Sequence, residues 1–233
     1  MRRPRAFVRV AGPDAADYLQ RMVSNDVASL APGDSCEALL LTPKARIIAP
    51  LRVLRRADED FLLLTEPELG DRVAAELQRM RFVAKCEIVR EPHESWLVLG
   101  GDEIVDQRPE GEEVSEEEAE RARIAAGIPR WGRDLDERVL PAEAGLDRTH
   151  VSFTKGCYPG QEPIARLHYR GHVNRRLRVL EVESASPGDE IVSKDKSVGR
   201  VTSAVPGLAL GYVRAEVPDD ASLTVGGRPA RLH

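Results

Sequence analysis

The chain has 233 residues, of which 42% are hydrophobic, so it can bury a core without cross-links. Its net charge of -5 and its 31% of charged residues do not indicate a nucleic-acid-binding or membrane-surface protein. The three cysteines, Cys36, Cys86 and Cys157, are scattered, which excludes a disulfide framework and a paired-cysteine metal site. The arginine-rich start contains no long apolar run, so we expect a cytoplasmic chain with no membrane partner.

The first hundred residues alternate strand and helix patterns. One helix is predicted over residues 12–22, with Pro13 in its first turn, and another over residues 65–80, with Thr65 and Glu68 as a capping box. Short aliphatic runs predict strands over residues 6–10, 35–42, 46–56, 60–65, 86–90 and 95–101. This mixture indicates an α+β region.

A glutamate-rich stretch follows, with a second capping box at Ser115 and Glu118 and a natural helix stop at Gly127. Glutamates in a first helical turn complement the helix dipole, and we favour this interpretation over an acidic docking segment.

From Arg175 onward only strand patterns occur, and Gly226 and Gly227 form a predicted hairpin turn. This part predicts a small barrel or sandwich. We therefore divide the chain into an α+β region, residues 1–170, and a C-terminal β domain, residues 171–233.

The stretch KGCYPGQEPIAR, residues 155–166, concentrates chemically useful side chains. Gly156 and Gly160 predict a tight loop that exposes Cys157. The cations Lys155 and Arg166 would lower the pKa of the thiol, and a thiolate is a nucleophile or a soft metal ligand. The alternative is that Cys157 is a small buried hydrophobe and that the glycines only turn the chain.

This stretch resembles the K-G-C-Y-x-G-Q-E-x-x-x-R motif of the YgfZ family. The resemblance extends to YLQRMVSNDVASLAPGD and to RARIAAGIPRWGRDLDERVLPAEAGL. That family is related to the glycine-cleavage T-protein, a tetrahydrofolate-dependent aminomethyltransferase. The resemblance implies an α+β, T-protein-like folate-binding fold, with ferredoxin-like α/β subdomains and a small C-terminal β-barrel.

The resemblance also implies a role in the assembly or repair of iron–sulfur enzymes, including enzymes that modify tRNA. Cys157 would be the reactive thiolate, which holds a cluster edge, relays sulfur or is oxidised in place of a client's ligand. Lys155 and Arg166 would tune this thiol or bind anionic groups. The remaining motif residues would shape and fix the loop: Gly156, Tyr158, Gly160, Gln161 and Glu162.

We expect no stably bound metal. Three dispersed cysteines are too few for a cluster of the chain's own. His168 and His172 stand four residues apart, but no further ligand has a suitable spacing, so a metal site there is disfavoured.

The resemblance implies tetrahydrofolate or a derivative as ligand. Its candidate contacts here are Asn25, Asp26, Arg123, Trp131 and Arg133. Trp131 can stack on a flat heterocycle or serve as a core residue, and Asn25 and Asp26 can equally turn the chain after the first helix. A glutamate that contacts the pterin in the related proteins is Ala125 here, so we expect weakened binding.

The T-protein's catalytic aspartate aligns with Pro50, which cannot relay a proton. We therefore favour an assembly factor. The alternative is an aminomethyltransferase-like one-carbon enzyme with a relocated base, and a third option is a folate-sensing binding module.

The run RLHYRGHVNRRLR, residues 166–178, is locally basic. It suits a folate glutamyl tail, a phosphate or an acidic partner protein, whereas the alternative is a charged strand edge. The expected partners are iron–sulfur enzymes or their assembly machinery, with no direct nucleic acid, and the chain is expected to be a monomer.

Overall fold

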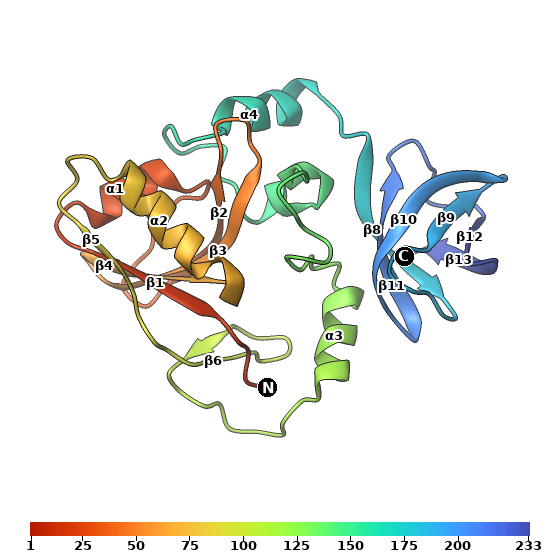
Figure 1. Cartoon of the computed structure of the whole chain (residues 1–233), viewed down its shortest axis with the longest axis horizontal. Helices are drawn as coiled ribbons and strands as arrows, with labels where there is room; N and C mark the ends of the chain where they lie inside the picture. Colours follow the sequence, from red (N-terminus) through yellow and green to blue (C-terminus); the bar gives the residue numbers. More distant parts are fainter. The chain divides into compact units, whose positions relative to one another are not determined.

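The computed structural model describes all 233 residues and divides into two compact units (Figure 1). We call residues 2–110 and 146–169 the sheet unit, and residues 1, 111–145 and 170–233 the barrel unit. These units follow contacts and not sequence order, so the division predicted at residue 170 stays a prediction. No helix combines the length and the apolar character that crossing a bilayer requires.

The sheet unit is built on five antiparallel strands in the order β2-β3-β4-β1-β5. Their bounds are β1 (Ala6–Ala11), β2 (Ser35–Leu41), β3 (Ile47–Ala57), β4 (Asp60–Thr65) and β5 (Glu87–Arg90). Aliphatic residues fill both faces of the central strands, as in β4, where Leu62 and Leu63 are both buried. The predicted strand over residues 95–101 is shorter, because β6 (Ser95–Trp96) pairs with β7 (Ile104–Val105) and the chain turns between them.

Two helices of this unit, α1 (Ala15–Met22) and α2 (Gly70–Met80), bury Leu19 and Leu77 completely. The predicted capping box at Thr65 and Glu68 is wrong. Thr65 is the last residue of β4, and its buried hydroxyl donates to the carbonyl of Pro50 at 2.8 Å. A 3-10 turn, η1 (Pro67–Leu69), separates it from α2.

A further helix, α4 (Gln161–Arg170), follows the Cys157 loop, and a 3-10 turn, η3 (Leu146–Arg148), precedes that loop. The strand-edge interpretation of the basic run is wrong over residues 166–170, which belong to α4. Pro163 lies in the first turn of α4, where a missing N–H leaves no helical hydrogen bond unmade.

The barrel unit holds a closed six-stranded barrel in the order β10-β11-β8-β13-β12-β9, which confirms the predicted C-terminal barrel. The strands are β8 (Arg175–Val182), β9 (Glu190–Ser193), β10 (Lys196–Val205), β11 (Gly207–Arg214), β12 (Leu223–Val225) and β13 (Arg228–Leu232). Leu180, Ile191 and Val225 are fully buried in its core.

Helix α3 (Glu116–Ala125) contacts β10 and β11. The predicted capping box is confirmed, since Ser115 and Glu118 each bond the other's backbone N–H, and Gly127 follows the helix at φ +66°. A 3-10 turn, η2 (Pro141–Glu143), leads toward β8.

Candidate functional site

The Cys157 loop, residues 155–160, presents the most accessible thiol of the chain. Cys157 is exposed, whereas Cys36 is half-buried and Cys86 is buried. Burial raises the pKa of Cys86, and it raises the pKa of Cys36 to about 11. The alternative that Cys157 is a buried hydrophobe is therefore wrong.

Gly160 fixes the position of this loop. Its φ of +85° is a left-handed conformation, and a Cβ there would lie 2.7 Å from the Thr42 carbonyl oxygen and 3.1 Å from Ala45 Cα. The loop therefore sits directly on the turn between β2 and β3. At Gly156 a Cβ would meet nothing within 4 Å, and the backbone has no positive φ. Only the second glycine of the motif is required by the geometry.

Lys155 ties the loop to the chain that follows α1. Its side-chain ammonium donates to the carbonyl oxygens of Val23 at 2.8 Å and Asn25 at 2.7 Å, and it lies 5.4 Å from the centre of the Tyr158 ring. Burial lowers the pKa of Lys155 to about 8, although the charge of Asp26 opposes this shift. Neither hydrogen bond goes to Cys157, so Lys155 acts here as a buried anchor.

Tyr158 packs under the loop, and its hydroxyl is buried without a hydrogen-bond partner. Burial raises the pKa of this phenol to about 12. Gln161 bonds the Tyr158 carbonyl through its backbone N–H at 3.2 Å, whereas the side chains of Gln161 and Glu162 form no hydrogen bond within the chain. The contacts that hold the loop come from Lys155, Tyr158 and Gly160.

Asn25 and Asp26 lie beside the anchor of Lys155. The Asn25 amide donates to the carbonyls of Glu37 and Thr149 at 2.7 and 3.2 Å, and its oxygen accepts from the N–H of Asp26. The Asp26 carboxylate accepts from the Gln20 side chain at 2.9 Å. These bonds agree with the alternative in which both residues turn the chain after the first helix.

A polar group that the sequence analysis missed adjoins these residues. His150 Nε2 lies 3.7 Å from Glu37 Oε2, and its Nδ1 lies 2.7 Å from the Thr149 hydroxyl. Burial lowers the pKa of His150 to about 4, so the imidazole is neutral at physiological pH. The hydroxyl of Ser24 donates to the His150 carbonyl at 2.6 Å. The only sequence signal was the position of His150 just before the motif.

Three other predicted folate contacts, Arg123, Trp131 and Arg133, belong to the barrel unit. The guanidinium of Arg123 donates to both carboxylate oxygens of Glu120, to the fully buried carboxylate of Asp134 at 2.7 Å and to the Ile128 carbonyl. Arg123 is therefore fully engaged within the unit.

Arg133 pairs with Glu120 at 3.1 Å but stays largely exposed, and Trp131 is half-buried. Arg133 lines a cavity of about 520 Å³ together with Arg138, Arg175 and Tyr212. Of the five predicted folate contacts, Trp131 forms no side-chain hydrogen bond within the chain, and Arg133 stays largely exposed despite its bond to Glu120.

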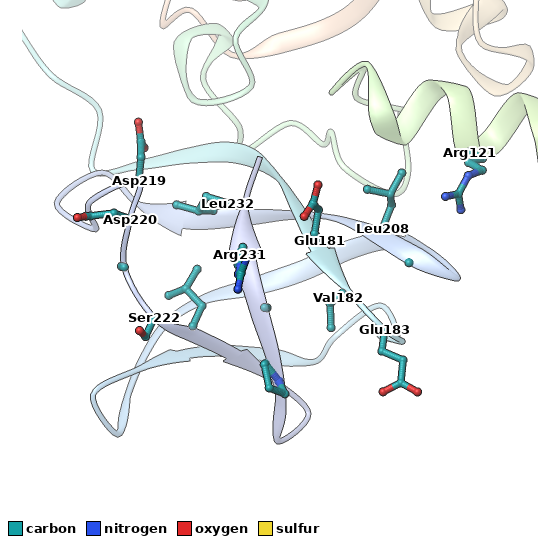
Figure 2. A pocket seen from close by; sticks show the side chains of 15 residues that line it. Arg121, Glu181, Val182, Glu183, Leu208, Asp219, Asp220, Ser222, Arg231 and Leu232 are labelled. Carbon is teal, nitrogen blue, oxygen red and sulfur yellow. The ribbon is translucent and has the colours of Figure 1, made fainter.

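A second cavity, of about 780 Å³, lies on the barrel at β8, β13 and the segment before β12. Its charged lining includes Glu181, Asp219, Asp220 and Arg231 (Figure 2). No sequence motif includes any of these residues.

Within their own units, most of the predicted folate contacts are bonded to neighbouring residues. Asn25, Asp26 and Arg123 all form side-chain hydrogen bonds there. Ala125, in place of the pterin-binding glutamate, is exposed on α3 and offers no acceptor. We therefore assign no step of the function to folate.

Comparison with known proteins relates both units to families. Residues 6–100 match the GCVT N-terminal domain, and residues 174–233 match the CAF17 C-terminal β-barrel domain. The chain is 24% identical to an iron–sulfur cluster assembly factor IBA57 homolog, mitochondrial, of Pyricularia oryzae, over 97% of this chain and 73% of the relative. It is 27% identical to the tRNA-modifying protein YgfZ of Edwardsiella ictaluri, over 72% of this chain and 66% of the relative.

A solved structure shows the same fold. Aminomethyltransferase T of the glycine cleavage system from Bartonella henselae matches with a TM-score of 0.80 at 19% identity, over 98% of this chain and 82% of that one. The predicted T-protein-like fold and the resemblance to the YgfZ family are thereby confirmed.

Proposed function

We propose that this chain, whose residues 6–100 match the GCVT N-terminal domain and whose residues 174–233 match the CAF17 C-terminal β-barrel domain, assists the assembly or repair of iron–sulfur enzymes, in line with its similarity to YgfZ and IBA57 proteins. The proposal includes enzymes that modify tRNA, in line with the name of the YgfZ relative. Its expected partners are iron–sulfur enzymes or their assembly machinery.

The observation that carries the proposal is the exposed Cys157 thiol on a loop that is held from beneath. Gly160 seats the loop on the β2–β3 turn, and Lys155 anchors it to two backbone carbonyls. A fixed, solvent-facing thiol is suited to meet a sulfur or iron centre on another protein. The thiol would hold a cluster edge, relay sulfur or take an oxidation in place of a client's ligand.

Arg166 adds a cation on α4, nine residues after Cys157, and forms no ion pair within the chain. In the proposed function it binds anionic groups that approach the thiol. Lys155, Tyr158 and Gly160 support the loop, whereas Gly156 and the side chains of Gln161 and Glu162 make no contact that fixes it.

The test is complementation in cells that lack the endogenous protein. Cells would express the unmodified chain, Cys157→Ser or the matched control Cys36→Ser, and the activity of an iron–sulfur enzyme and the methylthio modification of tRNA would be measured. We expect Cys157→Ser to fall to the level of cells without the protein and Cys36→Ser to remain active. Full activity with Cys157→Ser would refute the proposal.

A folate-dependent one-carbon enzyme is the competing function, and the solved aminomethyltransferase shares the fold. Position 50 argues against it here, because Pro50 lies in β3 with no acid–base group and its carbonyl already accepts from Thr65. An assay of the purified chain for aminomethyl transfer separates the two, since turnover would favour the enzyme.

Weak binding of tetrahydrofolate or a derivative is retained as a separate proposal. Anaerobic calorimetry with Arg133→Ala and Trp131→Ala tests it, because Trp131 is only half-buried and Arg133 stays largely exposed despite its ion pair with Glu120. Saturable heat that both variants lose would support the proposal, and no heat from the unmodified chain would refute it. The cytoplasmic location and the monomeric state stay predictions, and the IBA57 relative is named mitochondrial.

A further inference from the structure

Helix α4 carries an aromatic cluster next to the Cys157 loop. The rings of Phe153 and His168 stack with centroids 3.9 Å apart, and Tyr169 meets both edge-on, at 6.2 Å from Phe153 and 4.9 Å from His168. Tyr169 nevertheless stays 67% exposed, which makes it one of the few large apolar side chains that face solvent. The cluster thus supports one largely exposed tyrosine ring at the surface.

Two arginines flank this ring on the same face of the helix. Arg166 and Arg170 stand three residues before and one residue after Tyr169, both are exposed, and neither has an ion-pair partner within the chain. Most arginines of residues 2–110 are paired with carboxylates, as Arg5 is with Glu103 at 2.8 Å. In a chain of net charge -5, this face is a local positive surface.

We propose that the face formed by Arg166, Tyr169 and Arg170 is a docking surface for an acidic segment of the partner protein that brings its iron–sulfur site to Cys157. The proposal rests on the proposed function. An exposed tyrosine beside two arginines has the composition of an interface hot spot, because the ring buries a large area on binding and the guanidinium groups pair with carboxylates.

The spacing suits this role. α4 begins four residues after Cys157, and Tyr169 lies eight residues further, about 12 Å along the helix axis. A standard interface covers about 800 Å² on each partner, which corresponds to a patch about 30 Å across. An interface of this size, centred between Tyr169 and the start of α4, extends to the Cys157 loop.

The observations favour a protein over a nucleic acid. Proteins that bind single strands stack successive bases on several exposed rings, whereas Phe153 and His168 are stacked on each other and only Tyr169 presents a largely exposed ring. Two unpaired arginines are few for a phosphate backbone, which proteins neutralise with several cations. An isolated anion would need an enclosing pocket, whereas this helix face is open.

The test compares two matched double variants in the complementation assay. Tyr169→Ala with Arg170→Gln removes the exposed ring and one charge from α4. Phe82→Ala with Lys85→Gln does the same at the turn after α2, where Phe82 is 80% exposed and Lys85 has no ion-pair partner. Circular dichroism and thiol labelling of Cys157 would verify that both variants keep the fold and the loop.

At native expression we expect the α4 variant to lose client-enzyme activity, because its affinity for the partner falls about tenfold, while the control stays active. Strong overexpression should restore the α4 variant by mass action but should not restore Cys157→Ser, whose defect is chemical. This difference separates a docking failure from a failure of the thiol.

Full activity of the α4 variant at native expression, with Cys157→Ser inactive, would overturn the docking surface and leave the proposed function intact. Full activity of Cys157→Ser would overturn both. The purified variants would also be titrated with total tRNA and with polyglutamyl tetrahydrofolate. If the α4 variant alone lost binding of one of these ligands, the face would be assigned to that ligand. The proposal of a protein partner would then be wrong.

Discussion

The Cys157 loop and the Asp134 cluster both contain buried polar side chains, but only the cluster pairs all of its functional groups internally. We define the Asp134 cluster as Arg123, Asp134, Thr202 and Ser203 of the barrel unit, where the buried carboxylate accepts from the other three side chains. In the Cys157 loop, the buried Lys155 bonds only backbone carbonyls, and the thiol beside it is left to solvent. Complete internal pairing thus marks structural residues, and a free group on a supported loop marks the chemical site.

The largest expected effect breaks the Asp134 cluster. Asp134→Ala would remove one of the two carboxylates that hold the buried Arg123 guanidinium, together with the acceptor of the Thr202 and Ser203 hydroxyls, and we expect the free energy of unfolding to fall by about 3–5 kcal/mol. Asp136→Ala, which removes a more exposed pair with Arg138, should cost less than about 1 kcal/mol. Urea unfolding measures both. Equal losses would show that the burial of a carboxylate does not determine how much its ion pair contributes to the free energy of unfolding.

The second expected effect concerns the seat of the loop. Gly160→Ala forces a side chain into a left-handed backbone and against the Thr42 carbonyl, so we expect a loss of about 2 kcal/mol or more and altered labelling of Cys157. Gly156→Ala meets no neighbour and should change stability by less than about 0.5 kcal/mol. Similar behaviour of the two variants would contradict the proposed seat of the loop on the β2–β3 turn.

Local patterns predicted most of the fold. Aliphatic runs identified the strands of the sheet and the barrel, and the Ser115–Glu118 box fixed the start of α3 because capping depends on neighbours in sequence. Thr65 and Glu68 have the same local signature, but the Thr65 hydroxyl is captured by Pro50 in the adjacent strand. A tertiary hydrogen bond therefore determines the role of Thr65, and no local sequence pattern indicates such a bond.

The site was predicted only in part, because its tertiary contacts are likewise absent from local sequence patterns. The motif correctly indicated an exposed Cys157, but Lys155 was interpreted as a neighbouring cation, and its carbonyl partners lie 132 and 130 residues earlier in the chain. Arg123 was likewise selected by its sequence context, although Glu120 and Asp134 hold it in place. Which charges are buried depends on contacts that only the folded chain creates.

A third prediction uses pH to test the anchor. Because burial lowers the Lys155 pKa from 10.5 to about 8, the folded chain binds fewer protons than the unfolded chain between these values. The cost of burying the charge is present below pH 8 and is relieved as the pH rises toward 10.5. Relative to Lys155→Met, the stability of the unmodified chain should rise over this window by up to about 1.4 kcal/mol per pH unit.

Urea unfolding of both proteins at several pH values measures this difference. The variant serves as the baseline for all other titrating groups. A difference that falls with pH would show that Lys155 is stabilised as an ammonium and is not penalised by burial.

The smallest expected effect comes from the one polar atom of the loop that is buried and unpaired. Tyr158→Phe removes the hydroxyl and keeps the ring beside the Lys155 ammonium, so stability should be unchanged or higher by about 1 kcal/mol. Lower stability in urea unfolding would mean that the hydroxyl has a partner in solution. Unchanged or higher stability with intact iron–sulfur enzyme activity would make Tyr158 a packing residue, like the members of the Asp134 cluster. The same stability with lost activity would mean that the loop keeps an unsatisfied hydroxyl for a ligand, because a group that costs folding energy and is nevertheless required must act on something outside the chain.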